Sequence, residues 1–199
     1  MYSLPKATEL SQQLAKKTLF SKYNLTPKQR EMIDGDISRM VLSNVISPAK
    51  LPSIHEGSKV KTVYVLQVQL KTKDYHLETF KKLAELIRQN LVFALHCGDE
   101  VQFAICYMHF ITTSWMKSDA ASLEPEGLTM DAVWENLIRS IGELEVITDI
   151  PLDEQIRLEE ERVEVQRCID RLTRQMNAEK TPKKKFELHQ EITKLKTKL

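Results

Sequence analysis

The chain has 199 residues, 42% of them hydrophobic, which suits one ordinary core with an appendage and is short for two independent domains. The net charge of +1 excludes a strongly basic protein, but the charge is unevenly distributed. Residues 1–30 hold six Lys and Arg against one Glu, and residues 180–199 hold seven Lys against two Glu, so each end carries +5 and the middle −9. Either the basic ends neutralise the acidic middle, which we favour, or they contact nucleic acid.

The cysteines and the apolar segments indicate the compartment. Cys97, Cys106 and Cys168 are an odd number in different predicted elements, which favours a reducing environment over a disulfide framework. The N-terminus has no apolar run typical of a signal peptide. The longest apolar stretch, residues 101–116, is interrupted by polar residues and is shorter than the roughly 20 residues that cross a bilayer. We therefore expect a cytoplasmic protein without membrane contact.

The first 25 residues are polar and weakly patterned, so we expect a short helix or an extended arm there. A helix start follows, because Thr26 can cap a helix, Pro27 suits its first turn and Gln29 occupies the capping-box position. Apolar residues then recur at helical spacing up to Ser47 and Pro48, which are expected to end the helix. They are Ile33, Ile37, Met40, Val41 and Val45. The sequence predicts one long helix between Thr26 and Ser47.

Residues 62–71 change to an apolar period of two, which predicts a strand with one wholly apolar face. Asp74 is expected to cap the helix that follows. The inner face of that helix is predicted to consist of Leu77, Phe80, Leu83, Ala84 and Ile87.

Two apolar runs, residues 91–97 and 101–108, meet at Gly98 and Asp99, which is a signal for a β-hairpin. A two-residue turn there places Val92 opposite Ile105, Ala94 opposite Phe103 and Phe93 opposite Ala104. Both faces of the hairpin are apolar, so it should lie inside a covered sheet.

Residues 111–128 look irregular, and Thr129 then caps a helix that Gly142 ends. A short strand is expected at 144–147, before Pro151. The fold class is α/β (α+β): a small mixed sheet of about three to five strands covered by helices, with a C-terminal antiparallel helical hairpin. The expected division is residues 1–150 as the α/β body with a basic N-terminal arm, and residues 151–199 as the coiled-coil-like hairpin.

The hairpin is predicted from two apolar stripes at helical spacing, separated by a polar turn and by Thr181 and Pro182, which restart a helix. Folding the second helix back places Phe186 near Leu172, Ile192 near Val165 and Leu199 near Leu158. Two helices alone cover their stripes incompletely, so we expect the hairpin to bind a protein partner or a second copy. The predicted partner-binding residues are Leu158, Val165, Ile169, Leu172, Met176, Phe186, Leu188, Ile192 and Leu195.

Two patterns invite a metal site. Cys97, Cys106, His109 and His96 could hold zinc, but Cys106 and His109 are the only closely spaced pair, and the predicted β-hairpin separates Cys97 from Cys106. Ordinary buried thiols are the favoured interpretation.

Gln69, Leu70 and Lys71 end a predicted strand and resemble the Glu-x-Lys element of the PD-(D/E)xK nucleases, in which two acidic residues hold Mg²⁺. A helix that carries Glu31, Asp34 and Asp36 precedes them. Gln69 is neutral, and the predicted elements lack the three consecutive strands that this fold places between its helices. Lys71 is therefore a catalytic candidate only in this alternative, and no cofactor or metal is expected.

Lysines cluster in the turn and second helix of the hairpin, with Lys180, Lys183, Lys184 and Lys185 as candidate nucleic-acid contacts. A solvated face opposite the acidic first helix is the favoured alternative, because no aromatic residue is interleaved among them and Phe186 is expected in the core.

The chain resembles a bacterial family described as domain of unknown function 4391. The resemblance covers almost the whole chain. It depends on Leu4-Pro5-Lys6, the helix entry at Leu25-Thr26, the strand at 65–71, the hairpin at 91–107, the helix at 133–141 and the closing KFELHQEITKLK at 185–196. Acidic residues are common in the family at the position of Gln69, so this chain departs there, which weakens a metal role. The resemblance implies an accessory subunit of restriction-like defence systems and brings no established activity.

The function expected from the sequence is a non-catalytic adaptor or accessory subunit that acts by protein–protein contact. Its setting would be a bacterial nucleic-acid-processing or restriction-like defence system. The alternative is a divergent PD-(D/E)xK-like nuclease or a nucleic-acid-binding protein that uses the basic N- and C-terminal segments.

Overall fold

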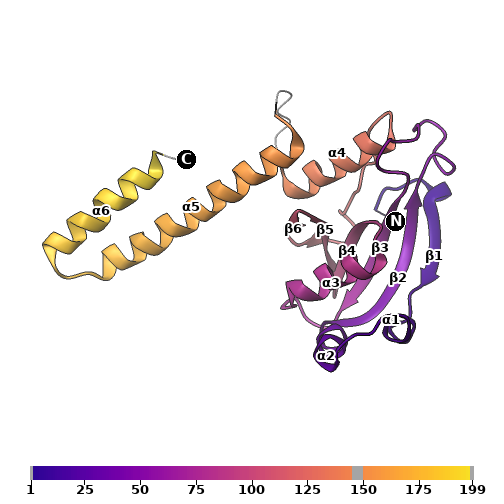
Figure 1. Ribbon diagram of the computed structural model, residues 1–199, viewed down its shortest axis with the longest axis horizontal. Helices are drawn as coiled ribbons and strands as arrows, with labels where there is room; N and C mark the ends of the chain where they lie inside the picture. The colour runs from indigo at the N-terminus through magenta and orange to yellow at the C-terminus, as the bar shows by residue number, and fades with distance from the viewer. Residues whose placement is uncertain (1, 145–149, 198–199) are drawn as a thin grey trace. The chain divides into compact units, whose positions relative to one another are not determined.

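The computed structural model describes residues 2–144 and 150–197 of the chain (Figure 1). The chain divides into two compact units, residues 1–145 (the first unit) and residues 146–199 (the hairpin unit). The strand expected at 144–147 falls outside the described residues, apart from Leu144. Leu199, predicted to lie near Leu158, also falls outside them. No described helix is both long enough and apolar enough to span a bilayer.

The first unit is built on one mixed sheet with helices packed against it (Figure 1). Its elements are η1 (Lys6–Thr8), β1 (Glu9–Gln13), α1 (Lys16–Lys22), α2 (Pro27–Asp36), β2 (Ile37–Ile46), β3 (Val63–Leu70), α3 (Leu77–Ile87), β4 (Asn90–Cys97), β5 (Glu100–Tyr107), β6 (His109–Thr112), β7 (Met116–Lys117) and α4 (Met130–Gly142). Within the described residues seven strands form the sheet, in the order β1-β2-β3-β4-β5-β6 with β7 beside β5. Strands β3 and β4 are parallel and the other strand pairs are antiparallel.

The mixed α+β class is confirmed, but the predicted number of strands, three to five, was too small. The largest error concerns the long helix predicted between Thr26 and Ser47. The capping box is present, because the Gln29 N–H donates to Thr26 Oγ1 at 3.3 Å and the Thr26 N–H donates to Gln29 Oε1 at 3.0 Å. The helix nevertheless ends at Asp36, and Ile37–Ile46 is strand β2.

Two β-bulges explain why β2 looks helical in sequence. Its register against β3 shifts at Ser38 and again at Ser43, so that one extra residue is inserted at each place. Each bulge serine donates its hydroxyl proton to a backbone carbonyl of β3. Every bulge moves the buried positions on by one residue. The buried set is consequently Ile37, Met40, Ser43, Asn44 and Ile46, whose spacing imitates a helical stripe.

The other missed strands carry little periodic signal. All five residues of β1 are exposed, so no apolar alternation marks this edge strand, and its polar side chains discourage pairing with another chain. Strand β7 and the second half of β6 lie in residues 111–128, which were expected to be irregular, and the two strands have only two and four residues. A period cannot be recognised over such short lengths.

The elements at the centre of the sheet, and the helices next to them, agree with those predicted from the sequence. The strand at 62–71, the helix after it, the β-hairpin and the helix after Thr129 are confirmed as β3, α3, β4–β5 and α4. The predicted hairpin register is also confirmed, since Val92 lies opposite Ile105 and Phe93 lies opposite Ala104.

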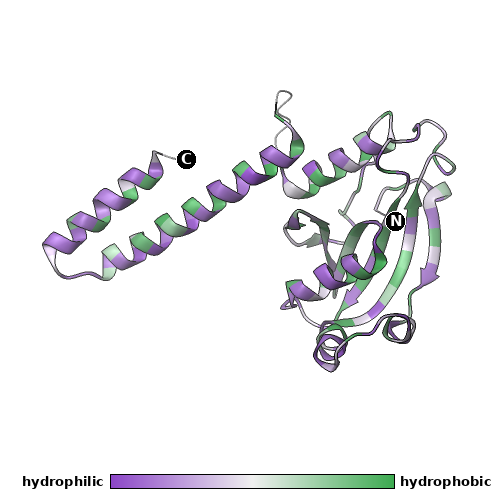
Figure 2. Ribbon diagram, viewed as in Figure 1, coloured by the Kyte–Doolittle hydropathy of each residue, from purple (hydrophilic) through white to green (hydrophobic). Residues whose placement is uncertain are grey.

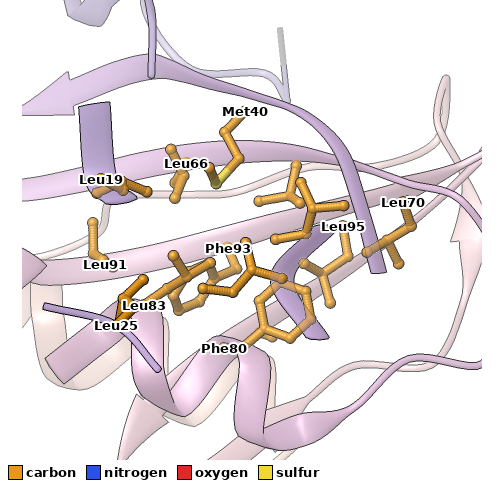
Figure 3. Packing of buried hydrophobic residues seen from close by; sticks show 14 residues of the cluster. Leu19, Leu25, Met40, Leu66, Leu70, Phe80, Leu83, Leu91, Phe93 and Leu95 are labelled. Carbon is orange, nitrogen blue, oxygen red and sulfur yellow. The ribbon is translucent and has the colours of Figure 1, made fainter. Parts of the chain in front are cut away.

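Hydrophobic side chains cover both faces of the sheet. On one face, side chains from α1, α2 and α3 pack against alternate residues of the central strands (Figure 3). The members labelled there are Leu19, Leu25, Met40, Leu66, Leu70, Phe80, Leu83, Leu91, Phe93 and Leu95. The buried face of α4 contributes none of its residues to this cluster, and α4 contacts β5 and β6. We conclude that α4 packs on the opposite face.

A carboxylate ties the loop before β3 to the start of α4. Asp131 accepts hydrogen bonds from the backbone N–H of Ser58 at 2.6 Å, of Lys59 at 3.0 Å and of Val60 at 2.7 Å, and from the Ser58 hydroxyl at 2.7 Å. The loop fits closely there, because a Cβ at Gly57 would lie 2.4 Å from Asp131 Oδ1. The Val60 N–H and then the Ser58 hydroxyl hold the pKa of the Asp131 carboxyl well below its usual value.

Asp131→Asn is expected to lower the melting temperature at pH 7 by several degrees. A carboxyl whose pKa is depressed in the folded state stabilises the fold above its unfolded pKa of about 3.9, and this contribution is lost as the pH falls towards the folded pKa. The difference between the two proteins should therefore shrink below about pH 4. Thermal unfolding of both proteins between pH 3 and pH 7 measures it, and a difference that stays constant with pH would contradict the assignment.

The hairpin unit contains α5 (Leu152–Ala178) and α6 (Pro182–Lys196), which fold back on each other and show alternating hydrophilic and hydrophobic bands (Figure 2). Ile169, Leu172 and Ile192 are buried between the helices. Val165, Cys168, Met176, Leu188 and Leu195 pack around them, half-buried.

Phe186 does not lie near Leu172 as predicted. Its side chain is 61% exposed and outside the hairpin core. Phe186 precedes Leu188 by two residues, which corresponds to a rotation of about 200° around the helix, so it lies on the side of α6 that faces away from α5.

Candidate functional site

The structure brings Lys71 next to the acidic end of α2, as the nuclease hypothesis requires. The Lys71 N–H donates to the backbone carbonyl of Asp36 at 2.9 Å, and Lys71 Nζ donates to the backbone carbonyl of Asp34 at 2.5 Å. The sheet also supplies an antiparallel run of β1, β2 and β3 before α3. The sequence prediction lacked that run because β1 and β2 were not recognised.

The carboxylate of Asp36 is hydrogen-bonded within the fold. It is 95% buried and accepts a hydrogen bond from the His76 N–H at 3.2 Å and another from the Thr79 hydroxyl, and it contacts His76 Nδ1 at 2.9 Å. His76 is the N-cap of α3, and its side chain makes no capping bond. Asp36 therefore caps α3 from a neighbouring element, a role that the sequence assigned to Asp74.

The acidic residue nearest to Lys71 on the surface is also engaged. Asp34 forms an ion pair with Lys16 at 2.6 Å, and the same ammonium donates to the carbonyl of Ile37 at 2.9 Å. Gln69 supplies a neutral amide at this place, and its Nε2 lies 3.4 Å from the carbonyl oxygen of His96. The side chains around Lys71 therefore suit a structural junction better than a cation site.

His96 contributes a buried polar pair beside Gln69. The Tyr2 hydroxyl lies 2.5 Å from His96 Nε2. Burial raises the pKa of Tyr2 and lowers that of His96, so at neutral pH the tyrosine is protonated and the imidazole is uncharged. The hydrogen bond between the Tyr2 hydroxyl and His96 Nε2 ties the N-terminal segment to β4.

The residues considered for zinc do not gather. Cys97 pairs with Glu100 at the turn of the β-hairpin, whereas Cys106 pairs with Phe110 at its other end. Burial raises the pKa of Cys106 to about 12, so this thiol is a poor metal ligand and a poor nucleophile. Within residues 2–144 and 150–197, no group of three or more His, Cys, Asp or Glu side chains is placed to hold a metal ion.

The hairpin unit exposes two apolar side chains on α5. Helix α5 has 27 residues and α6 has 15, so about twelve residues of α5, or roughly 18 Å, extend beyond the length that α6 can cover. Leu158 in this uncovered part lies on the same stripe as Ile169 but is 44% exposed, and Val163 is 41% exposed. Leu152 and Ile156, on another side of the helix, are buried.

The opposite end of the hairpin unit, residues 171–186, is called the distal end below. Its four candidate lysines, Lys180, Lys183, Lys184 and Lys185, are placed together around the turn between α5 and α6. Phe186 follows them directly and is exposed. Phe186 was expected in the core, although its phase against Leu188 and Ile192 is a signal in the sequence that it lies on the other side of the helix.

Most of the predicted partner-binding residues pack against each other within the hairpin unit. Ile169, Leu172 and Ile192 are buried there, and Val165, Met176, Leu188 and Leu195 surround them. Leu158 and Phe186 are the two members of the predicted set that remain strongly exposed.

The comparisons with known proteins bear on the family alone. No curated protein and no solved structure matches the chain. The family model described as domain of unknown function (DUF4391) matches residues 3–199, nearly the entire length. The chain therefore belongs to the DUF4391 family.

Proposed function

We propose that this protein is a non-catalytic adaptor or accessory subunit that acts by protein–protein contact through its helical hairpin. The observation that carries the proposal is the uncovered part of α5, where Leu158 and Val163 stand exposed on a helix that α6 is too short to cover. Leu158 and Val163 lie about 140° apart around α5, so a partner has to wrap around this part of the helix to use both as apolar anchors.

The charge around these two residues indicates the chemistry of the partner. Residues 152–164 hold six acidic side chains and two arginines, a net charge of −4. A partner surface that combines an apolar groove with basic residues at its rim would complement this part of α5. The family resemblance motivates placing that partner in a nucleic-acid-processing or restriction-like defence system.

The test uses the full-length chain, with Leu158→Glu and Val163→Glu combined in one variant. Both side chains are exposed, so the variant is expected to fold. We expect it to lose a stoichiometric partner that the unaltered chain retains in quantitative affinity capture, or to lose self-association in light scattering. Phe186→Ala, an exposed change at the other end, should retain both. Identical behaviour of all three proteins would overturn the proposal.

A second candidate function is a divergent PD-(D/E)xK-like nuclease. The observation that favours it is the meeting of Lys71 with the backbone of Asp34 and Asp36 at the end of β3. Mg²⁺-dependent cleavage of DNA or RNA that is lost in Lys71→Ala would support this function. Unchanged cleavage in Lys71→Ala, or none with the unaltered chain, would remove it.

A further inference from the structure

Charge is segregated along the length of the hairpin unit. Residues 152–170 hold three arginines against seven acidic residues, which gives −4. The distal end, residues 171–186, holds six Arg and Lys against one Glu, which gives +5. A solvated face opposite the acidic first helix, the interpretation favoured from the sequence, does not account for a basic cluster at one end. The distal end is therefore a concentrated cationic surface on an otherwise acidic helix pair.

An aromatic side chain lies within this cationic surface. Phe186 is 61% exposed and follows three consecutive lysines, Lys183 to Lys185. The apolar stripe of α6 already packs on α5 through Leu188, Ile192 and Leu195, so Phe186 is not needed for pairing of the helices. Lys183 precedes Phe186 by three residues and so lies on the same side of α6, which puts positive charge beside the flat apolar face of the exposed ring.

The turn that presents these residues is well defined. Glu179 Oε1 accepts hydrogen bonds from the N–H of Lys180 at 2.9 Å and of Thr181 at 2.8 Å. The backbone N–H of Thr181 is the main cause of the lowered pKa of Glu179, so this carboxylate stays ionised and bound to the turn. Pro182 begins α6 and Lys185 N–H closes its first turn on the Thr181 carbonyl at 3.0 Å. The lysines and Phe186 are thus held at the start of a helix.

We propose that the distal end binds single-stranded nucleic acid, with the lysines on backbone phosphates and Phe186 stacked on an unpaired base. Proteins that bind single strands combine a cationic track with an aromatic ring on which a base stacks. This goes beyond the proposed adaptor function, because it uses the end of the hairpin unit opposite to Leu158 and Val163.

Other anionic partners fit less well. Insertion into a membrane surface requires a broad apolar face, whereas the residues near Phe186 on the outer side of α6 are polar, namely Gln190 and Thr193. An acidic protein surface would use the lysines, but it would contact the phenylalanine ring only if it also carried an apolar groove. Duplex nucleic acid offers phosphates, but its bases are stacked on one another and closed to the ring.

The experiment is a titration of a fluorescein-labelled oligothymidylate with the full-length chain, followed by fluorescence anisotropy at about 50 mM and about 200 mM salt. Phe186→Ala should weaken binding at least about fivefold, and Phe186→Trp should retain it. The combined Lys183→Gln, Lys184→Gln and Lys185→Gln variant should weaken binding at least about tenfold and reduce the salt slope by about 2. The matched control is Lys194→Gln with Lys196→Gln, two exposed lysines farther along α6, which should have little effect.

Three outcomes would overturn the inference. The first is no binding to the single strand at the lower salt concentration. The second is equal binding to single strand and duplex with no effect of Phe186→Ala, which indicates unspecific attraction. The third is binding to phosphatidylserine vesicles in place of the oligonucleotide. The variant Leu158→Glu with Val163→Glu should bind the single strand normally, so this test is independent of the adaptor proposal.

Discussion

Phe80→Ala is expected to reduce the free energy of unfolding by about 3 to 5 kcal/mol, the range for removing a buried phenylalanine from a core. Phe80 is fully buried on α3 and fixes that helix to the sheet (Figure 3). Its ring contacts Phe93 edge-on at a centroid distance of 5.5 Å and stacks on Phe110 at 5.7 Å. Alanine in place of Phe80 would leave a cavity and remove both of these contacts between α3 and the strands β4 and β6.

The matched control for this change is Phe186→Ala, which removes the same atoms from an exposed position. Its effect on unfolding should stay within about 0.5 kcal/mol, as is usual for surface substitutions. Urea denaturation of both variants and the unaltered chain measures the difference. Similar losses for the two variants would show that Phe186 is part of the core and would contradict the exposed placement.

Asp36→Ala should also be strongly destabilising, by about 2 to 3 kcal/mol. The buried Thr79 hydroxyl and the part-buried His76 N–H at the start of α3 both lose their acceptor, and leaving such donors unsatisfied costs about 1 to 3 kcal/mol. Urea denaturation measures the loss, with Asp34→Ala as the control. Asp34 is 51% exposed and its ion pair with Lys16 should contribute no more than about 1 kcal/mol.

The outcome for Asp36 also discriminates between two roles. A carboxylate that serves metal binding often lowers the stability of the metal-free fold. Its removal then leaves the free energy of unfolding unchanged or increases it. If Asp36→Ala were as stable as the unaltered chain, the capping role would be wrong and the nuclease hypothesis would gain support.

The parts of the fold that could be predicted are those in which burial follows a regular period. Strand β3 and helix α4 each have a clean apolar face, and the glycine turn at Gly98 fixes the register of β4 against β5. Strand β2 could not be predicted, because two bulges interrupt its alternation. The cap of α3 could not be predicted either, because Asp36 is 40 residues from His76 in sequence and reaches it only through the fold.

The candidate site divides in the same way. The helical hairpin and its lysines could be recognised from local patterns, since the apolar stripes and the break at Thr181 and Pro182 are local signals. Which apolar residues remain exposed depends on the unequal lengths of α5 and α6 and on the rotation of α6 about its axis. Leu158 lies on the same stripe as Ile169, and only the paired helices show that it is exposed; Phe186 already differs from Leu188 in its phase along the helix.

Site-specific photo-cross-linking in cells tests the adaptor proposal most directly. Leu158 is replaced with p-benzoylphenylalanine in the full-length chain, and a matched chain carries the same replacement at Leu128, an exposed leucine of the first unit. We expect a cross-linked adduct of one defined mass from position 158 and none of that mass from position 128. No adduct from position 158, or the same adducts from both positions, would contradict it.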